Sequence, residues 1–189
     1  ARPDCSRITE RIRIMLRKKT THGPPVDDPA RARFQIGLPE PERLVGLGFR
    51  SWMAGYQTGD IACWEYAWVT YCRLLGPTQA RLALTDLACW VRAIRGASCR
   101  RIEVFPAQCA GFCRDECVAI SMVAASQHGA CPALKACAYA LLESSAIDEV
   151  VEGATCLGAT LRTCDRILSP ASICDALAMT GAVPGGRTN

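Results

Sequence analysis

Residues 59–77 read GDIACWEYAWVTYCRLLGP and contain signals for both ends of a helix. Asp60 is a residue type that favours the N-cap position, and Gly76 followed by Pro77 is typical of a helix end. Between these ends, large apolar side chains recur at the spacing i, i+4, i+7 and i+11: Trp64, Trp68, Tyr71 and Leu75. This spacing predicts a helix with one apolar stripe that packs against a core.

The stretches on either side of this helix carry similar signals. Apolar runs with helical spacing alternate with Gly, Pro, Ser or Asp at positions where helices begin or end. The further helices predicted in this way cover residues 44–56, 77–95, 107–128, 132–143, 145–168 and 170–179. Only residues 101–105 have the pattern of an extended segment. Because short connections favour antiparallel neighbours, we expect an all-α fold, an antiparallel bundle of about six to seven helices.

The N-terminal part of the chain differs from this pattern. Residues 1–20 contain seven Arg or Lys against two acidic residues, a net charge of +5, whereas the whole chain carries +4. Within them, residues 5–19 have the pattern of a basic amphipathic helix whose apolar positions are Ile8, Ile12, Met15 and Leu16. Residues 20–42 contain five prolines, which predict an extended linker or arm because proline interrupts a helix.

These patterns divide the chain into three parts. We expect residues 1–42 to form a basic N-terminal helix and a Pro-rich arm, residues 43–180 to form a Cys-rich helical bundle, and residues 181–189 to form a frayed tail. Half of the residues in the chain are hydrophobic, and the bundle is long enough to bury a core of its own.

Composition and hydropathy indicate the environment in which the protein works. The longest apolar run, residues 117–125, is too short to cross a bilayer, so we expect a soluble protein without a transmembrane segment. Residues 1–20 lack the continuous apolar stretch of a signal peptide, which favours a cytoplasmic protein with reduced thiols. Arginine outnumbers lysine nineteen to three, a bias typical of a GC-rich bacterial genome.

The chain contains thirteen cysteines, which could serve as disulfides, metal ligands, redox centres or packing residues. Disulfide scaffolds are usually short and loop-rich, and an odd number of cysteines leaves one unpaired. The most specific local pattern is Cys109-x3-Cys113-x3-Cys117. On an unbroken helix over residues 107–128, these thiols lie within an arc of about 80°, and His128 continues the arc.

This arrangement predicts a site for soft metal ions, with the ligands Cys109, Cys113, Cys117 and His128. Thiolates one turn apart can bind Cu(I) or Zn, but Cys109 and Cys117 are about 12 Å apart along the helix. The spacing therefore favours several Cu(I) ions over one tetrahedral zinc. Helical-bundle copper storage proteins place cysteines inward in a similar way, although they repeat the C-x3-C spacing on several helices. The alternative is packing, because cysteine is among the most often buried residue types.

A second pattern is His128-Gly129-Ala130-Cys131-Pro132. If Pro132 begins a helix, Cys131 lies in its N-cap region, where unpaired amides and the helix dipole lower the pKa of a thiol. Cys131 with His128 as an acid–base partner is therefore the candidate catalytic pair of a thiol-based redox protein. The alternative is a tight turn between two helices, with a polar histidine that faces water.

Other catalytic signatures are missing from the sequence. It contains no G-x-S-x-G, no P-loop, no G-x-G-x-x-G after a strand and no Glu-x-x-His pair. The pairs Asp115-Glu116 and Asp148-Glu149 are adjacent in sequence, so each spreads over about 100° of a helix surface. We expect both pairs to lie on solvated faces.

Three classes of function follow from these features. The first is a non-enzymatic interaction or structural domain, which the tryptophan-rich helices and the basic arm favour. Its partner is another protein or a second copy, bound through the arm. Nucleic acid is a weaker candidate, because no aromatic residues interleave with the basic ones. The second class is a Cys-rich protein that binds Cu(I) or Zn, and the third is the thiol-based redox protein.

Overall fold

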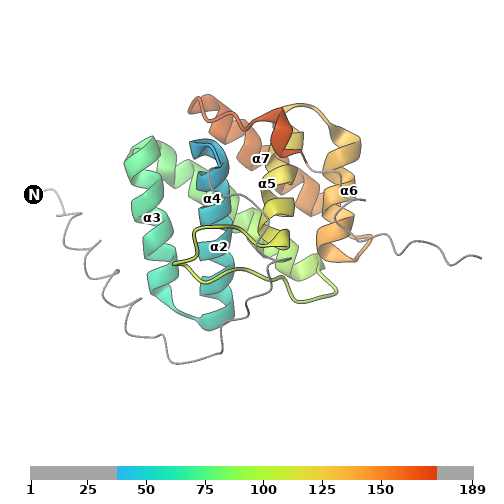
Figure 1. Ribbon diagram of the computed structural model, residues 1–189, viewed down its shortest axis with the longest axis horizontal. Helices are drawn as coiled ribbons and strands as arrows, with labels where there is room; N and C mark the ends of the chain where they lie inside the picture. The colour runs from blue at the N-terminus through green and yellow to red at the C-terminus, as the bar shows by residue number, and fades with distance from the viewer. Residues whose placement is uncertain (1–37, 174–189) are drawn as a thin grey trace, which may run out of the picture.

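The structure, a computed structural model, describes residues 38–173 (Figure 1). In this range the chain forms six α-helices and one short 3-10 helix, and no strand. The elements are α2 (Glu40–Thr58), α3 (Ile61–Leu75), α4 (Pro77–Ala97), α5 (Arg114–Gln127), α6 (Cys131–Leu142), α7 (Asp148–Thr163) and η1 (Pro170–Ser172). The all-helical prediction is thus confirmed for these residues. The basic segment, most of the Pro-rich arm and the predicted tail lie outside them.

The helix ends predicted around α3 are confirmed. α2 ends at Thr58, and its C-cap Gly59 has a φ of 68°, the left-handed conformation that favours glycine. The side chain of Asp60 then accepts a hydrogen bond from the backbone N–H of Ala62 and caps α3. Pro77 occupies the first turn of α4, where a backbone N–H would have no partner within the helix.

α2 begins earlier than its composition predicts. The proline content suggests a linker up to residue 42, but Pro39 is the N-cap of α2 and the helix begins at Glu40. Proline is compatible with the first turn of a helix, because the N–H groups there lack intrahelical partners. The helical body therefore includes the last two prolines of the predicted arm.

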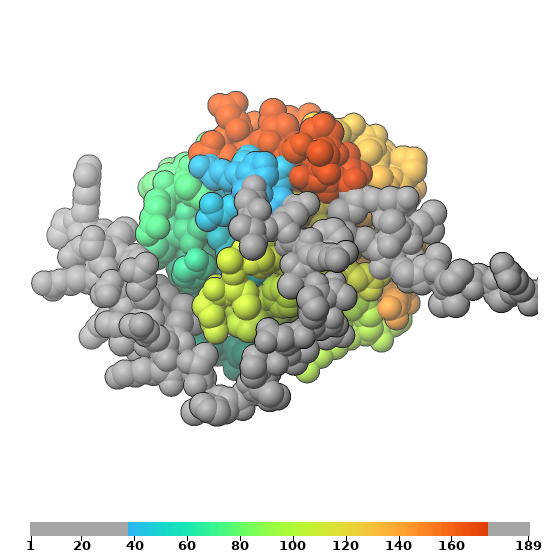
Figure 2. Space-filling view, viewed as in Figure 1, coloured from blue at the N-terminus to red at the C-terminus, as the bar shows by residue number. Residues whose placement is uncertain are grey.

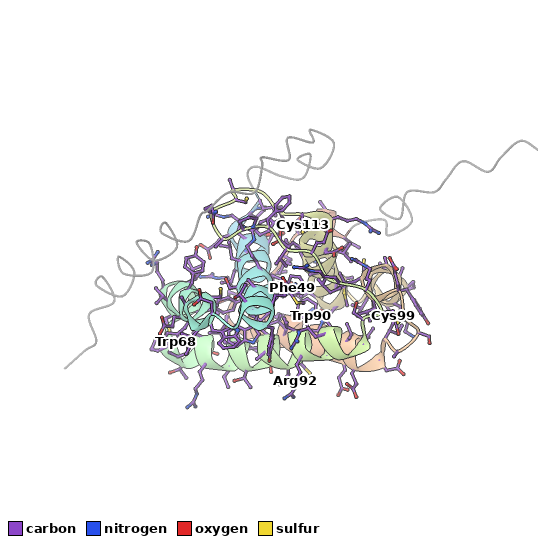
Figure 3. All side chains as sticks on the ribbon, turned by 90° about the horizontal axis from the view of Figure 1, so that it is seen from below. Phe49, Trp68, Trp90, Arg92, Cys99 and Cys113 are labelled. Carbon is purple, nitrogen blue, oxygen red and sulfur yellow. The ribbon has the colours of Figure 1, made fainter. Side chains whose placement is uncertain are left out.

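α2 and α5 lie side by side in the middle of the molecule, and α4 and α7 pack behind them (Figures 1 and 3). Trp90 of α4 is fully buried between these layers, and its ring centroid lies 5.7 Å from that of Phe49 of α2. Gly153 of α7 packs directly against Trp90, because a Cβ at this glycine would lie only 3.1 Å from the Trp90 Cα. The absence of a side chain at Gly153 therefore allows α4 and α7 to cross closely.

The predicted apolar faces differ in how deeply they are buried. On α4 the whole predicted face is buried: Ala83, Leu87, Trp90, Val91 and Ile94. On α3, Tyr71 is completely buried, but Trp68 is 43% exposed, so the stripe of this outer helix is only partly a core face. None of the helices that the structure describes has the length and apolar character needed to span a membrane.

Two helices are shorter than predicted. α5 begins at Arg114 rather than near residue 107, and α7 ends at Thr163 rather than near residue 168. After α7, Asp165 adopts a left-handed φ of 56°, and the chain leaves the helix there. The predicted last helix over residues 170–179 is described only for its start, which forms the 3-10 turn η1.

Candidate functional site

The predicted stripe of three thiols is not formed. Cys109 lies in the irregular segment 98–113, called the loop below, while Cys113 is the N-cap of α5 and Cys117 lies within that helix. The prediction of an unbroken helix over residues 107–128 is therefore wrong. The three sulfurs consequently do not line up along one face of a helix. Within the part of the chain that the structure describes, no group of three or more His, Cys, Asp or Glu is placed to hold a metal ion.

The two buried thiols of this pattern have separate hydrogen-bond partners. The thiol of Cys113 donates to the carbonyl of Glu103 at 3.2 Å, and that of Cys117 donates to the carbonyl of Phe112 at 3.9 Å. Burial, together with the nearby carboxylate of Glu116, raises the pKa of Cys113 to about 12. The Cys113 thiol is therefore neutral at physiological pH, and its hydrogen bond ties the loop to the start of α5.

The second predicted pattern forms a turn between α5 and α6. Cys131 is the first residue of α6 and is exposed. His128 is the C-cap of α5, and its Nε2 donates to the carbonyl of Leu168 at 2.8 Å. Gly129 between them has a φ of 66°, which only glycine adopts readily. His128 thus ties the segment after α7 to the end of α5, and its pairing with Cys131 in catalysis stays a prediction.

The loop crosses in front of α2 (Figure 1) and forms part of the front surface of the molecule beside α3 (Figure 2). A segment without helix or strand leaves its backbone N–H and carbonyl groups without regular partners, so side chains must supply acceptors for the N–H groups and donors for the carbonyls. Three side chains do this from beneath the loop and from its ends: Arg50, Asp115 and Glu116.

Arg50 of α2 is the centre of this arrangement, although no sequence motif indicates it. The residue is 1% exposed, and its Nε and Nη2 bind both oxygens of Glu116 at 2.6 and 3.0 Å. Its Nη1 donates to the carbonyl of Cys109 at 2.8 Å, and its Nη2 donates to that of Gly111 at 2.5 Å. The guanidinium also lies over the ring of Phe112, 4.8 Å from the centroid. Arg50 therefore supplies the donors that a helix would have supplied to these carbonyls.

Glu116 satisfies the loop from the other side. It is completely buried and accepts hydrogen bonds from the backbone N–H groups of Phe105 and Cys113, at 3.2 and 2.7 Å, in addition to those from Arg50. The bond to Cys113 is one half of a capping box at the start of α5. A helix start completed in this way explains why α5 begins at Arg114 and not seven residues earlier.

Asp115 anchors the beginning of the loop. It is 3% exposed, and its two oxygens bind Arg100 at 2.6 and 2.8 Å. One of these oxygens also accepts the backbone N–H of Glu103 at 2.8 Å. The hydrogen bond to Asp115 raises the pKa of Arg100. The expectation that the Asp115-Glu116 pair is solvated is therefore wrong, because both carboxylates are buried and bonded.

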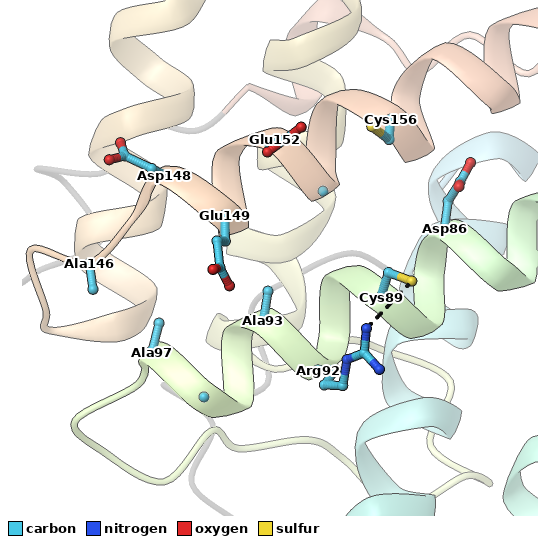
Figure 4. Close-up of a pocket in the computed structure, with 12 residues that line it drawn as sticks. Asp86, Cys89, Arg92, Ala93, Ala97, Ala146, Asp148, Glu149, Glu152 and Cys156 are labelled. Atoms are coloured by element: carbon cyan, nitrogen blue, oxygen red, sulfur yellow. Dashed lines mark hydrogen bonds between the residues drawn. The ribbon is translucent and has the colours of Figure 1, made fainter.

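A groove of about 840 Å³ lies between α4 and α7 (Figure 4). It is on the side of the molecule away from the loop, since Arg92 of the groove and Cys113 of the loop lie on opposite sides (Figure 3). Small residues form much of its lining: Ala93, Gly96, Ala97, Ala146 and Gly153. Four carboxylates border it: Asp86, Asp148, Glu149 and Glu152.

The groove is acidic, and most of its carboxylates are available. Asp148, Glu149 and Glu152 are exposed, and none of them has a hydrogen-bond or ion-pair partner among the described residues. Asp86 accepts a hydrogen bond from the hydroxyl of Thr160 at 2.6 Å. Arg92 is the basic residue of the lining. The expectation that the Asp148-Glu149 pair is solvated is thus confirmed.

A second, smaller groove of about 500 Å³ lies on the other flank of α4, against α3. Three tryptophans line it: Trp52, Trp64 and Trp68. Glu65 and Arg81 stand beside them, so this groove is apolar with balanced charges. The exposed Cys89 lines both grooves and marks the outer face of α4 between them.

These observations separate two kinds of polar cluster. The buried cluster around Arg50 and Glu116 has its hydrogen-bonding groups engaged within the molecule, whereas three of the carboxylates at the α4–α7 groove are exposed to solvent. No protein family, no curated protein and no solved structure matches this chain.

Proposed function

We propose that residues 38–173 form a non-enzymatic interaction domain that binds a basic helical segment of a protein in the α4–α7 groove. The observation that carries this proposal is the composition of the groove, which combines small residues with exposed carboxylates. Most of the lining is apolar in character, and the acidic groups stand around it. Such a surface matches a partner that has an apolar ridge flanked by basic side chains.

The dimensions of the groove suit a helix. Its lining extends along α4 from Asp86 to Ala97, a distance of about 16 Å along the helix axis. This length accommodates about three turns of a bound helix. The alanines and glycines of the lining leave room for the side chains of such a helix, because they project little from α4 and α7.

The charges of the groove determine the kind of helix. Exposed ion pairs contribute only about 0.2–1 kcal/mol each, but they select partners by sign and accelerate association. A basic segment gains these contributions, whereas an acidic segment is repelled by the four carboxylates. The apolar contacts then supply most of the affinity.

A peptide titration tests this proposal. The probe is a short, labelled amphipathic helix of Leu and Lys, and its binding is followed by fluorescence anisotropy. The protein is the full chain with R11Q, R13Q and R17Q, so that its own basic segment does not compete for the groove. Neutralising two groove carboxylates with E149Q/E152Q should weaken binding about 2- to 30-fold, since two exposed ion pairs are lost.

The matched control removes two exposed carboxylates outside the groove, with E65Q/E103Q. This variant should bind the probe as tightly as its parent. The proposal fails if the probe does not bind the parent, or if both double variants lose affinity equally.

A further inference from the structure

We infer that the segment bound in the α4–α7 groove is residues 5–19 of the same chain. This inference rests on the proposed function, because it names the occupant of the same groove. Charge complementarity is the first argument. Residues 1–20 carry a net +5 and the remaining residues sum to −1, while the groove gathers four carboxylates around one arginine. The most basic part of the chain and the acidic groove are therefore matched in sign.

The spacing of the segment matches the length of the groove. As a helix, residues 5–19 present an apolar ridge from Ile8 through Ile12 to Leu16, which covers about 12 Å of helix axis. The groove offers about 16 Å along α4. The ridge can therefore lie along the small residues of the lining, with the arginines on its flanks directed toward the carboxylates.

The linker is long enough to allow this arrangement within one chain. Residues 20–37 can span up to about 60 Å when extended. A body of 136 residues has a radius of gyration of about 14 Å, so the linker reaches any face of it. A tethered segment has an effective concentration in the millimolar range, which favours the same chain over a second copy.

The tryptophan groove on the other flank of α4 fits this segment less well. Its charged lining residues are Glu65 and Arg81, which balance each other. Such a surface accepts an apolar ridge but does not select a basic one. The acidic groove satisfies both requirements, and this difference assigns the segment to it.

Occupation by its own segment makes the groove self-inhibited. A partner with a similar basic helix must displace residues 5–19 before it binds, so its apparent affinity is lowered by the fraction of chains with a free groove. The Gln substitutions in the segment should therefore increase the apparent affinity of the Leu/Lys probe.

The cysteines of the chain provide the test. Four cysteines of the body are exposed; Cys89 and Cys156 line the groove, whereas Cys99 and Cys131 lie outside it. Cys5 belongs to the basic segment. The reduced full chain is treated with a short bismaleimide, and the cross-linked peptides are identified by mass spectrometry. Because Cys89 also lines the tryptophan groove, Cys156 is the cysteine that distinguishes the two grooves. We expect Cys5 to link to Cys156 at least tenfold more often than to Cys99 or Cys131.

Three further measurements sharpen the result. E149Q/E152Q should reduce the groove links at least threefold, whereas E65Q/E103Q should leave them unchanged. A mixture of ¹⁵N-labelled and unlabelled chains should give links within one isotope only, because mixed links would identify a second copy as the donor and overturn the assignment. Equal linking of Cys5 to all four exposed cysteines would also overturn it. If the Leu/Lys probe still binds the groove in that case, only this inference fails; if it does not, the proposed function fails as well.

Discussion

Two Asp-Glu pairs of this protein have the same local sequence and opposite surroundings. Asp115-Glu116 and Asp148-Glu149 each lie in the first turn of a helix, α5 and α7 respectively. The first pair is buried beneath the loop and bound to two arginines, whereas the second is exposed at the edge of the groove. Local position on a helix therefore does not decide whether a carboxylate is buried in the fold or exposed to solvent.

The difference arises from what precedes each helix. α5 follows sixteen residues of loop, whose backbone amides need acceptors and which brings Arg100 to Asp115. α7 follows a shorter connection after α6, residues 143–147, and both Asp148 and Glu149 remain exposed. An acidic pair becomes part of the core only where a segment of chain folds over it and a cation accompanies it.

The largest expected effect is at Glu116. E116Q leaves the buried Arg50 without its counter-charge, and the loss of one partner of a buried pair typically lowers stability by about 3–5 kcal/mol. E149Q, the matched change at the groove, should alter the free energy of unfolding by less than about 0.5 kcal/mol. Urea unfolding of both variants measures the difference. Equal losses would contradict the contrast between the two pairs.

A smaller effect is expected at Asp115. D115N weakens two charge-assisted hydrogen bonds to Arg100, whose side chain is 20% exposed and can be hydrated in the variant. We expect a loss of about 1–3 kcal/mol. Hydrogen exchange at the amide of Glu103 should accelerate in the same variant, because Asp115 is its acceptor. D148N at the start of α7 serves as the control, and a loss there as large as in D115N would contradict the assignment.

Much of the fold could be predicted from the sequence, and the exceptions have a common cause. The ends of α3 and the buried face of α4 depend on short-range signals, namely a capping aspartate, a glycine–proline stop and helical spacing. The shortening of α5 depends on Arg50, which is 66 residues away from Glu116 in the sequence, and no local pattern contains that information. Two local signals are nevertheless consistent with a later start of the helix: Gly111, near the beginning of the predicted helix, and the capping-box spacing between Cys113 and Glu116.

The candidate site was predicted less well than the fold. The cysteine pattern predicts a metal site that includes Cys109, but this residue lies in the loop. The groove instead combines residues of α4 and α7 that are far apart in sequence. The exposure of Asp148 and Glu149 was predicted, but their place beside a row of small residues on another helix depends on the packing of Gly153 against Trp90. Helical periodicity shows which face of each helix is apolar and not which two helices meet.

A modest effect is expected from the pH dependence of stability. The folded-state pKa of Cys113 is raised to about 12 from an ordinary value of 9.0, so the unfolded chain loses this proton first as pH rises. The stability associated with the neutral thiol is therefore present below pH 9 and is lost between about pH 9 and 12. C113S keeps a capping oxygen but does not titrate in this range, so its stability should fall less steeply. Burial also raises the pKa of Tyr71, and this residue contributes equally to the pH dependence of stability of the parent protein and of C113S.

The smallest expected effect is that of salt on the stability contributed by the buried Arg50–Glu116 ion pair. Buried charges are screened much less than exposed ones, so raising the NaCl concentration from 0.1 to 1 M should change the stability loss of E116Q by less than about 0.5 kcal/mol. The same salt should abolish most of the difference in probe binding between E149Q/E152Q and its parent. A strong salt dependence of the E116Q loss would show that the Arg50–Glu116 pair is solvated, and would remove the distinction between the two regions.

The ion pair between Arg50 and Glu116 has a consequence for the order in which the protein assembles. During synthesis α2 leaves the ribosome first, and its Arg50 remains hydrated until α5 emerges 66 residues later. α3 and α4 have to be synthesised before the Arg50–Glu116 ion pair can form. The loop before α5 therefore folds late. If the chain were cut between α2 and α5, each of the two fragments would contain only one residue of the Arg50–Glu116 ion pair. Neither fragment would then be expected to fold independently.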